Sequence, residues 1–229
     1  MDLSADEWTA IELSLRIAVV ATLVALPIGV AVAWLLARKS FYGKTLLDGL
    51  VHLPLVLPPV VTGYLLLLLF GRQGPAGALL AECCGVVLAF RWTGAALAGA
   101  VMGFPILVRA IRLSIEAVDR RLEQAADTLG APPAGVFLTV TLPLSLPGII
   151  AGMILSFAKA LGEFGATITF VSTIPGETET LPLAMYRALQ SPQGDTQALR
   201  LTLIAVVIAL AALLGANLLN RWAAARGGR

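Results

Sequence analysis

The stretch LSLRIAVVATLVALPIGVAVAWL, residues 13–35, holds a single charged side chain and decides the fold class. An α-helix needs about 20 mostly apolar residues to cross the roughly 30 Å hydrocarbon core of a bilayer. Four further apolar runs of similar length follow, over residues 46–70, 86–108, 141–162 and 199–219. The sequence therefore predicts an all-α integral membrane protein with about five transmembrane helices, in one transmembrane domain over residues 1–229.

The composition supports a membrane class and excludes several others. Hydrophobic residues make up 58% of the 229 residues and charged residues 13%, against about 25% charged in soluble domains. A net charge of +2 gives no basic field for nucleic acid. The chain has one histidine, and its two cysteines, Cys83 and Cys84, are adjacent. This set offers no histidine-based metal site and no CxxC motif, so we expect no cofactor bound by this chain.

The lysines and arginines predict the orientation, because basic loops stay in the cytoplasm. Four basic residues lie in one set of loops: Arg72, Arg91, Arg187 and Arg200. Ten lie in the other set: Arg38, Lys39, Lys44, Arg109, Arg112, Arg120, Arg121, Arg221, Arg226 and Arg229. We therefore expect the N-terminus outside, the C-terminus in the cytoplasm, and a cytoplasmic loop over about residues 109–140.

Two segments are expected to depart from simple spans. His52, Pro54, Pro58 and Pro59 indicate that the second span is broken or kinked. Residues 178–190 are too short to cross a bilayer, and the sequence leaves open whether they form an interfacial or a re-entrant helix.

The cytoplasmic stretch DRRLEQAADTLGAPP, residues 119–133, predicts a short helix with one apolar face. Leu122, Ala125, Ala126 and Leu129 recur at helical spacing and share one face. Asp119 is a suitable N-cap and Gly130 a suitable C′ residue. The pattern fits either a helix that docks on a cytoplasmic protein or a helix that lies on its own bundle or on lipid.

A longer motif surrounds this helix and carries a family resemblance. Gln124-Ala125-Ala126, Gly130, Val140 and Leu142-Pro143 have the spacing of the EAA loop of ABC importer permeases, with Gln124 in place of glutamate, Glu123 just before it, and Val140 in place of isoleucine. The segments LPLVLPPVVTG (53–63), LGEFGATITF (161–170) and IPGETETLPLAMY (174–186) resemble the molybdate permease branch, and sulfate permeases share part of the second.

The resemblance implies more than the residues alone. It implies a type I ABC importer permease fold in a bacterial inner membrane, and a homodimer with two ATP-binding subunits and an external oxyanion-binding protein. ATP and Mg would be used by the partner ATPase. The ATPase-coupling residues would be Leu122, Glu123, Gln124, Ala125, Ala126, Leu129 and Gly130.

A polar and small-residue stripe on the fourth span is a candidate translocation pathway. Its members share one helical face: Ser145, Gly148, Gly152, Ser156 and Lys159. The alternative is a helix–helix seam, in which Lys159 extends to the interface or pairs with Glu163 four residues on.

The sequence bears on three classes of function: an enzyme, a secondary anion transporter and an ATP-driven importer. Gly43-Lys44-Thr45 lacks the earlier glycine of a phosphate-binding loop, because Arg38 stands there, and no catalytic set of residues is found. The chain is thus not expected to be an enzyme. A secondary anion transporter would show internal repeats and carboxylates at mid-membrane, which are not seen. The expected function is import of molybdate or tungstate, with a sulfate or thiosulfate importer as the alternative, since physics alone does not fix the oxyanion.

Overall fold

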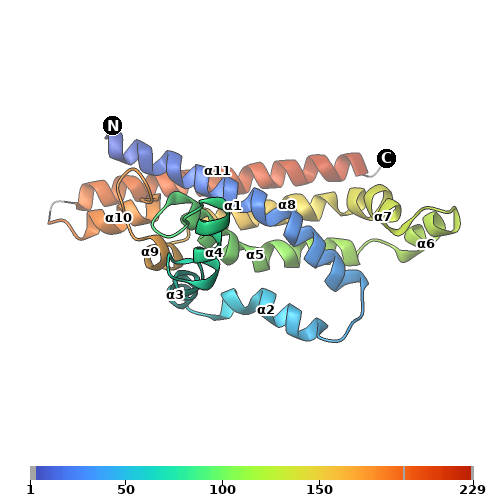
Figure 1. The fold of residues 1–229 in the computed structure, drawn as a ribbon. Coiled ribbons are helices and arrows are strands. Elements are labelled where there is room, and N and C mark those ends of the chain that lie inside the picture. The colour runs from blue at the N-terminus through green and yellow to red at the C-terminus, as the bar shows by residue number, and fades with distance from the viewer. Residues whose placement is uncertain (1–3, 193, 228–229) are drawn as a thin grey trace.

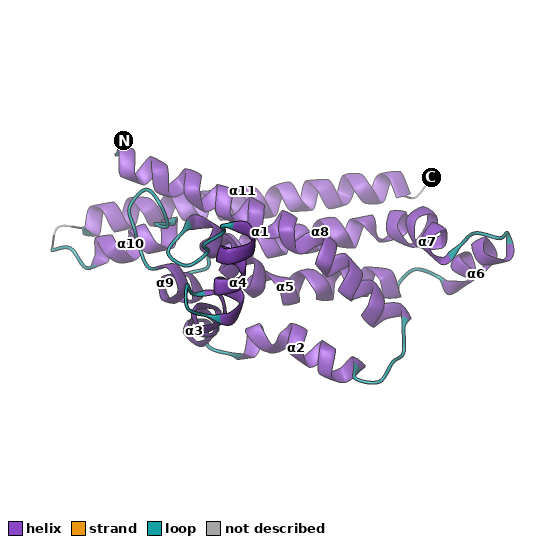
Figure 2. Cartoon of the chain, in the orientation of Figure 1, coloured by secondary structure: helices purple, strands orange, loops and turns teal. Residues whose placement is uncertain are grey.

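The computed structural model describes residues 4–192 and 194–227, with side chains described as far as Gly215 (Figures 1 and 2). Throughout these residues the regular structure is helical, so the all-α class is confirmed. The elements run in this order: α1 (Ala5–Arg38), α2 (Lys44–Val56), α3 (Pro59–Phe70), α4 (Pro75–Cys84), α5 (Trp92–Glu116), α6 (Arg120–Thr128), α7 (Pro133–Val136), the π-helix η1 (Phe137–Thr141), α8 (Leu142–Leu161), α9 (Gly165–Val171), α10 (Leu181–Leu189) and α11 (Asp195–Gly227).

Within the described part of the chain, four helical segments are long and apolar enough to span a membrane. They are α1, α5, the continuous run Pro133–Leu161, and the Asp195–Gly215 part of α11. The pair α2 and α3 passes the same test together and is bent by 116°, which gives up to five spans. This agrees with the five apolar runs in the sequence. Of the basic residues used to predict orientation, Arg229 lies outside the described residues.

The helices extend beyond the apolar runs because polar residues continue or cap them. Ser4 caps α1 in a reciprocal arrangement with Glu7, so this helix begins well before residue 13. The third span was expected over 86–108, but α5 runs from Trp92 to Glu116. Its charged end is stabilised by an ion pair between Arg112 and Glu116, one turn apart at 2.8 Å. The loop expected over 109–140 therefore contains the end of α5, all of α6 and α7, and most of η1.

The second apolar run is broken at its prolines, as predicted. Helix α2 ends at Val56 and α3 begins at Pro59, because neither Pro58 nor Pro59 can donate a backbone hydrogen bond. Only Val51 of α2 is buried, and Figure 1 shows α2 at the edge of the bundle. A 3.1 Å ion pair between Asp48 and Arg112 joins α2 to α5.

The core lies where α1, α5 and α8 pack together. Leu36, Leu107 and Ile111 are fully buried in one of its apolar clusters. Small residues allow close approach, since a Cβ on Gly103 of α5 would lie 2.5 Å from the Ser156 hydroxyl of α8.

The segment 178–190, expected as a short helix, contains α10. This helix packs on α1 and α11 through the buried side chains of Leu181 and Ala184. Figure 1 shows α10 and α6 at opposite ends of the bundle, which is the arrangement expected of an external and a cytoplasmic segment.

Candidate functional site

Helix α6 is closed at both ends by the residues that the sequence indicated. The Asp119 side chain accepts a 2.9 Å hydrogen bond from the backbone N–H of Arg121. Gly130 has φ of +86°, and the N–H groups of Gly130 and Ala131 donate back to the carbonyls of Asp127 and Ala126. These two bonds form a Schellman motif, which requires a residue with positive φ at C′. Both predicted helix ends are therefore confirmed.

The bundle leaves most of the apolar face of α6 uncovered. We call Leu122, Ala125, Ala126 and Leu129 the α6 apolar face. Leu122 is 50% exposed, Leu129 is 88% exposed and Ala125 is also exposed, whereas Ala126 is half-buried; no residue of α6 is fully buried. A nine-residue helix is marginal alone in water. The exposure of most of this face disfavours one alternative left by the sequence, namely a helix that lies on its own bundle.

Glu123 ties α6 to the membrane helices. Its Oε1 accepts hydrogen bonds from Arg38 Nε at 3.1 Å and from the Thr141 hydroxyl at 2.6 Å, and Arg38 also reaches the Val118 carbonyl at 3.0 Å. The Arg38 and Glu123 side chains are 9% and 17% exposed. One carboxylate thus links α6 to the end of α1 and to η1. Sequence reasoning named Glu123 but missed Arg38 and Thr141 as its partners.

The neighbouring Gln124, which stands at the glutamate position of the EAA pattern, is exposed. Like Glu123, it lines a cavity between α6 and the end of α1. The two residues differ in exposure and bonding: Glu123 is half-buried and bonded to Arg38 and Thr141, whereas Gln124 is exposed.

The predicted pathway stripe on α8 faces α5. Ser145 and Ser156 are fully buried, and the Ser114 hydroxyl of α5 donates a 3.2 Å hydrogen bond to the Ser145 carbonyl. A Cβ added to Gly148 would clash with Ser114, and one added to Gly152 would lie 3.1 Å from the Leu107 carbonyl. This geometry favours the helix–helix seam over a lining of the pathway.

Lys159, the last member of the stripe, is paired with Glu163. Lys159 Nζ lies 2.6 Å from Glu163 Oε2, and the two side chains are 31% and 2% exposed. The other oxygen of Glu163 accepts a 3.0 Å hydrogen bond from the backbone N–H of Ala166, at the start of α9. The lysine charge is therefore held by a buried carboxylate, which is the pairing that the sequence offered as the alternative.

The sequence did not predict two ion pairs at the end of the bundle opposite α6. Glu7 of α1 binds Arg200 of α11 at 2.6 Å, and Glu179, in the loop before α10, binds Arg187 at 2.8 Å. Burial raises the pKa of the Glu179 carboxyl above its ordinary value, and the nearby Arg187 and Thr173 only partly offset this effect.

Among the described residues, no three histidine, cysteine or acidic side chains are grouped closely enough to hold a metal ion.

Comparison with known proteins identifies the family. Residues 25–226 match the model of a family described as "binding-protein-dependent transport system inner membrane component". The chain belongs to this family. The family is one of inner membrane proteins, in agreement with the apolar spans.

Several relatives of this chain are named as transport proteins. This chain is 56% identical over 229 residues to the molybdenum transport system permease protein ModB of Escherichia coli, with 100% of both chains covered. It is 56% identical to the ModB protein of Haemophilus influenzae over 96% of this chain and 94% of the relative. A sulfate transport system permease protein, CysW of Synechococcus elongatus, is 39% identical over 91% of this chain and 74% of that one.

Solved structures show the fold. A bacterial ABC transporter involved in import of the acidic polysaccharide alginate matches with a TM-score of 0.74 at 17% identity, covering 96% of this chain and 80% of that one. The MetNI methionine ABC transporter matches with a TM-score of 0.69 at 14% identity, covering 95% and 94%. This chain thus has the type I ABC importer permease fold that the sequence predicted.

Proposed function

We propose that this chain is the membrane-spanning permease subunit of an ATP-driven molybdate importer. The observation that carries the proposal is the 56% identity, over the full length of both chains, to a molybdenum transport permease. The 39% identity to a sulfate permease is lower and covers less of that protein. Tungstate, a tetrahedral oxyanion like molybdate, is expected to share the route.

The proposed assembly is a homodimer of this chain with two cytoplasmic ATP-binding subunits and an external oxyanion-binding protein. In this assembly ATP and Mg are used by the ATPase, and this chain supplies the route and the coupling. The lipid bilayer is the remaining partner. The proposed orientation has the N-terminus outside and α6 in the cytoplasm, from the asymmetry of lysine and arginine between the loops.

The α6 apolar face is proposed to seat on the ATPase. Leu122, Ala125 and Leu129 are exposed and Ala126 is half-buried on a helix that is closed at both ends, which leaves a small surface available to a partner. Glu123 then joins the docked helix to α1 and η1, so that a displacement of α6 is passed to two membrane elements. ATP binding and hydrolysis would thereby bias an inward-open against an outward-open arrangement.

For the stripe on α8 we propose a packing role in the first place. The small residues of this stripe bring α5 and α8 into close contact: Ser145, Gly148, Gly152 and Ser156. The two helices can then move as one unit together with α6. A lining role for these residues stays a hypothesis that requires α5 and α8 to part during the cycle.

The orientation is tested by thiol labelling. The variants Glu177→Cys and Ala125→Cys are made in a background with Cys83→Ala and Cys84→Ala. Residue 177 precedes α10 and residue 125 lies in α6, and these two helices lie at opposite ends of the bundle in Figure 1. The first should react with an impermeant reagent in spheroplasts, and the second only after lysis. Equal reaction of both in intact spheroplasts would contradict the orientation.

The docking role is tested with matched lysines on α6. Ala126→Lys puts a long charged side chain into the α6 apolar face, whereas Asp127→Lys puts the same side chain on a different side of the helix. Ala126→Lys should weaken ATPase binding about tenfold or more, because a close-packed face tolerates neither the volume nor the desolvated charge. Gly130→Val should act similarly through its positive φ. Unchanged binding in both variants, with Asp127→Lys also unchanged, would refute the docking site.

The substrate is tested by deleting the gene. Cells without this chain should have low molybdenum content and low molybdoenzyme activity, restored by millimolar external molybdate through other routes. Normal molybdenum uptake together with defective sulfate uptake would move the assignment to a sulfate or thiosulfate importer.

A further inference from the structure

An apolar groove runs along the outside of the bundle between α1 and the α7–η1–α8 segment. Its volume is about 660 Å³. Its walls are almost entirely apolar, and the residues that shape it include Leu26, Val30, Trp34, Pro133, Phe137 and Leu142. In the proposed orientation this groove opens at the depth of the cytoplasmic leaflet, because α1 ends there at Arg38 and Lys39.

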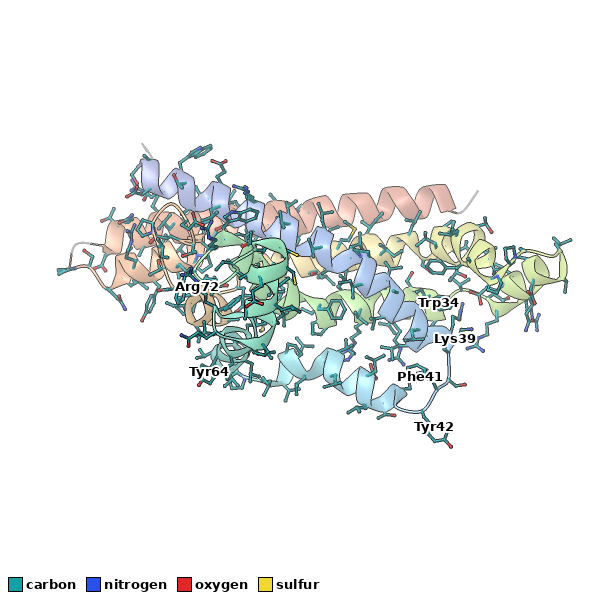
Figure 3. The ribbon with its side chains drawn as sticks, in the orientation of Figure 1. Trp34, Lys39, Phe41, Tyr42, Tyr64 and Arg72 are labelled. Carbon is teal, nitrogen blue, oxygen red and sulfur yellow. The ribbon has the colours of Figure 1, made fainter. Side chains whose placement is uncertain are left out.

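A basic cavity of about 280 Å³ adjoins the groove at its cytoplasmic end. The two spaces share Trp34, Pro133 and Phe137 as walls, and the rings of Trp34 and Phe137 meet edge to face with centroids 5.8 Å apart. Lys39 Nζ lies 5.4 Å from the centre of the Trp34 ring (Figure 3). The apolar and the charged space therefore form one continuous, amphipathic site.

The charges that line the cavity leave a surplus of positive charge. Arg38 is neutralised by Glu123, at 3.1 Å. Lys39, Arg120 and Asp127 also line the cavity, and none of these three makes an ion pair with a described residue. Two unpaired cations face one unpaired carboxylate, which is suited to a ligand with a single negative charge.

We propose that this site binds an anionic phospholipid of the cytoplasmic leaflet, with one acyl chain in the groove and its phosphate between Lys39 and Arg120. The apolar groove alone would accept any lipid tail, and the basic cavity alone would accept any small anion. Their junction at Trp34 selects a molecule with both parts, and basic pockets at this face of membrane proteins suit anionic headgroups. Tryptophan is also the side chain favoured at the boundary between headgroups and acyl chains.

The site adjoins the tether of α6, which gives the lipid a physical consequence. Arg120 is the first residue of α6, and the cavity lies between α6 and the end of α1. A bound phosphate would add a second link between these helices, next to the Arg38–Glu123 pair. Anionic lipid should therefore hold α6 more firmly in the position described here.

Trp34 provides a direct probe, because it forms a wall of both spaces. The full chain carrying Trp8→Phe, Trp92→Phe and Trp222→Phe keeps Trp34 as its one tryptophan, and Phe at 92 retains an aromatic face for Arg16, which stacks there at 4.0 Å. It is reconstituted in phosphatidylcholine vesicles with increasing fractions of dibrominated phosphatidylglycerol or dibrominated phosphatidylcholine. Bromine quenches tryptophan fluorescence only at close range.

The expected result is a preference for the anionic lipid of about fivefold or more in relative association constant, the size given by one basic side chain near a membrane surface. Lys39→Gln and Arg120→Gln should each reduce the preference toward one. Arg121→Gln is the matched control, since Arg121 is the next residue of α6 and does not line the cavity, and it should leave the preference unchanged. Ala31→Phe, which fills the groove, should reduce quenching by both lipids.

Three results would overturn the proposal. Equal quenching by the two lipids would show an unselective groove, and equal loss in Arg121→Gln would show general surface attraction. Quenching by neither lipid would show that protein, such as a second copy of the chain, covers the groove. Both leaflets of the vesicle contain the brominated lipid, so the outcome does not depend on the proposed orientation.

Discussion

Replacing Glu123 by alanine should detach α6 from the membrane helices without unfolding them. The Glu123 carboxylate accepts from Arg38 at 3.1 Å and from Thr141 at 2.6 Å, in a setting where both charged side chains are less than one-fifth exposed. Hydrogen bonds to charged groups contribute about 1.5–3 kcal/mol each. Because the site keeps some solvent, we take about 2 kcal/mol for the whole tether, which corresponds to a roughly 30-fold change in a local equilibrium.

Amide hydrogen exchange measures this equilibrium directly. The amides of α6 should exchange roughly 30-fold faster in Glu123→Ala than in the wild type, while those of α5 stay unchanged. Asp127→Asn removes one negative charge from the same helix without breaking an ion pair, and α6 should then exchange at the wild-type rate. If exchange in Glu123→Ala equals that in Asp127→Asn, Glu123 does not hold α6 and the proposed route of coupling fails.

Three further predictions concern the seam and the external ion pairs. Gly148→Ala should lower stability by about 1–3 kcal/mol, because the added Cβ clashes across the α5–α8 seam, whereas Gly49→Ala meets open space and should not lower the midpoint of thermal unfolding. Lys159→Ala should destabilise the protein by leaving Glu163 buried and unpaired, and adding Glu163→Gln should restore stability; no rescue would mean that Lys159 acts by itself. The raised pKa of Glu179 means that the folded state holds this proton more tightly than the unfolded one, so stability should increase as the pH falls from neutral toward 4.5, and Glu179→Gln should remove that increase.

The sequence allowed prediction where local chemistry decides the structure. The apolar runs located the membrane helices, and Pro58 and Pro59 located the break between α2 and α3. Asp119 and Gly130 marked both ends of α6, because capping depends on residues within one turn. The positive φ of Gly130 followed from the same pattern.

Prediction failed where distant or polar residues decide. Helix α5 continues to Glu116 because its charged end is stabilised by side-chain pairs that a hydropathy window ignores. Arg38 and Glu123 are 85 residues apart, so no local spacing connects them. Periodicity showed that Ser145 and Ser156 share a face of α8 but not that α5 covers that face, since a helical wheel contains no information about neighbours.

Uptake into proteoliposomes tests the central claim most directly. The membrane should contain this chain, with its ATPase partner added or omitted, and the oxyanion-binding protein and radiolabelled molybdate should be supplied on the opposite side from the ATPase. The account predicts that molybdate accumulates only when both the ATPase and ATP are present. Accumulation at the same rate without the ATPase, or ATP-driven accumulation of sulfate with none of molybdate, would contradict it.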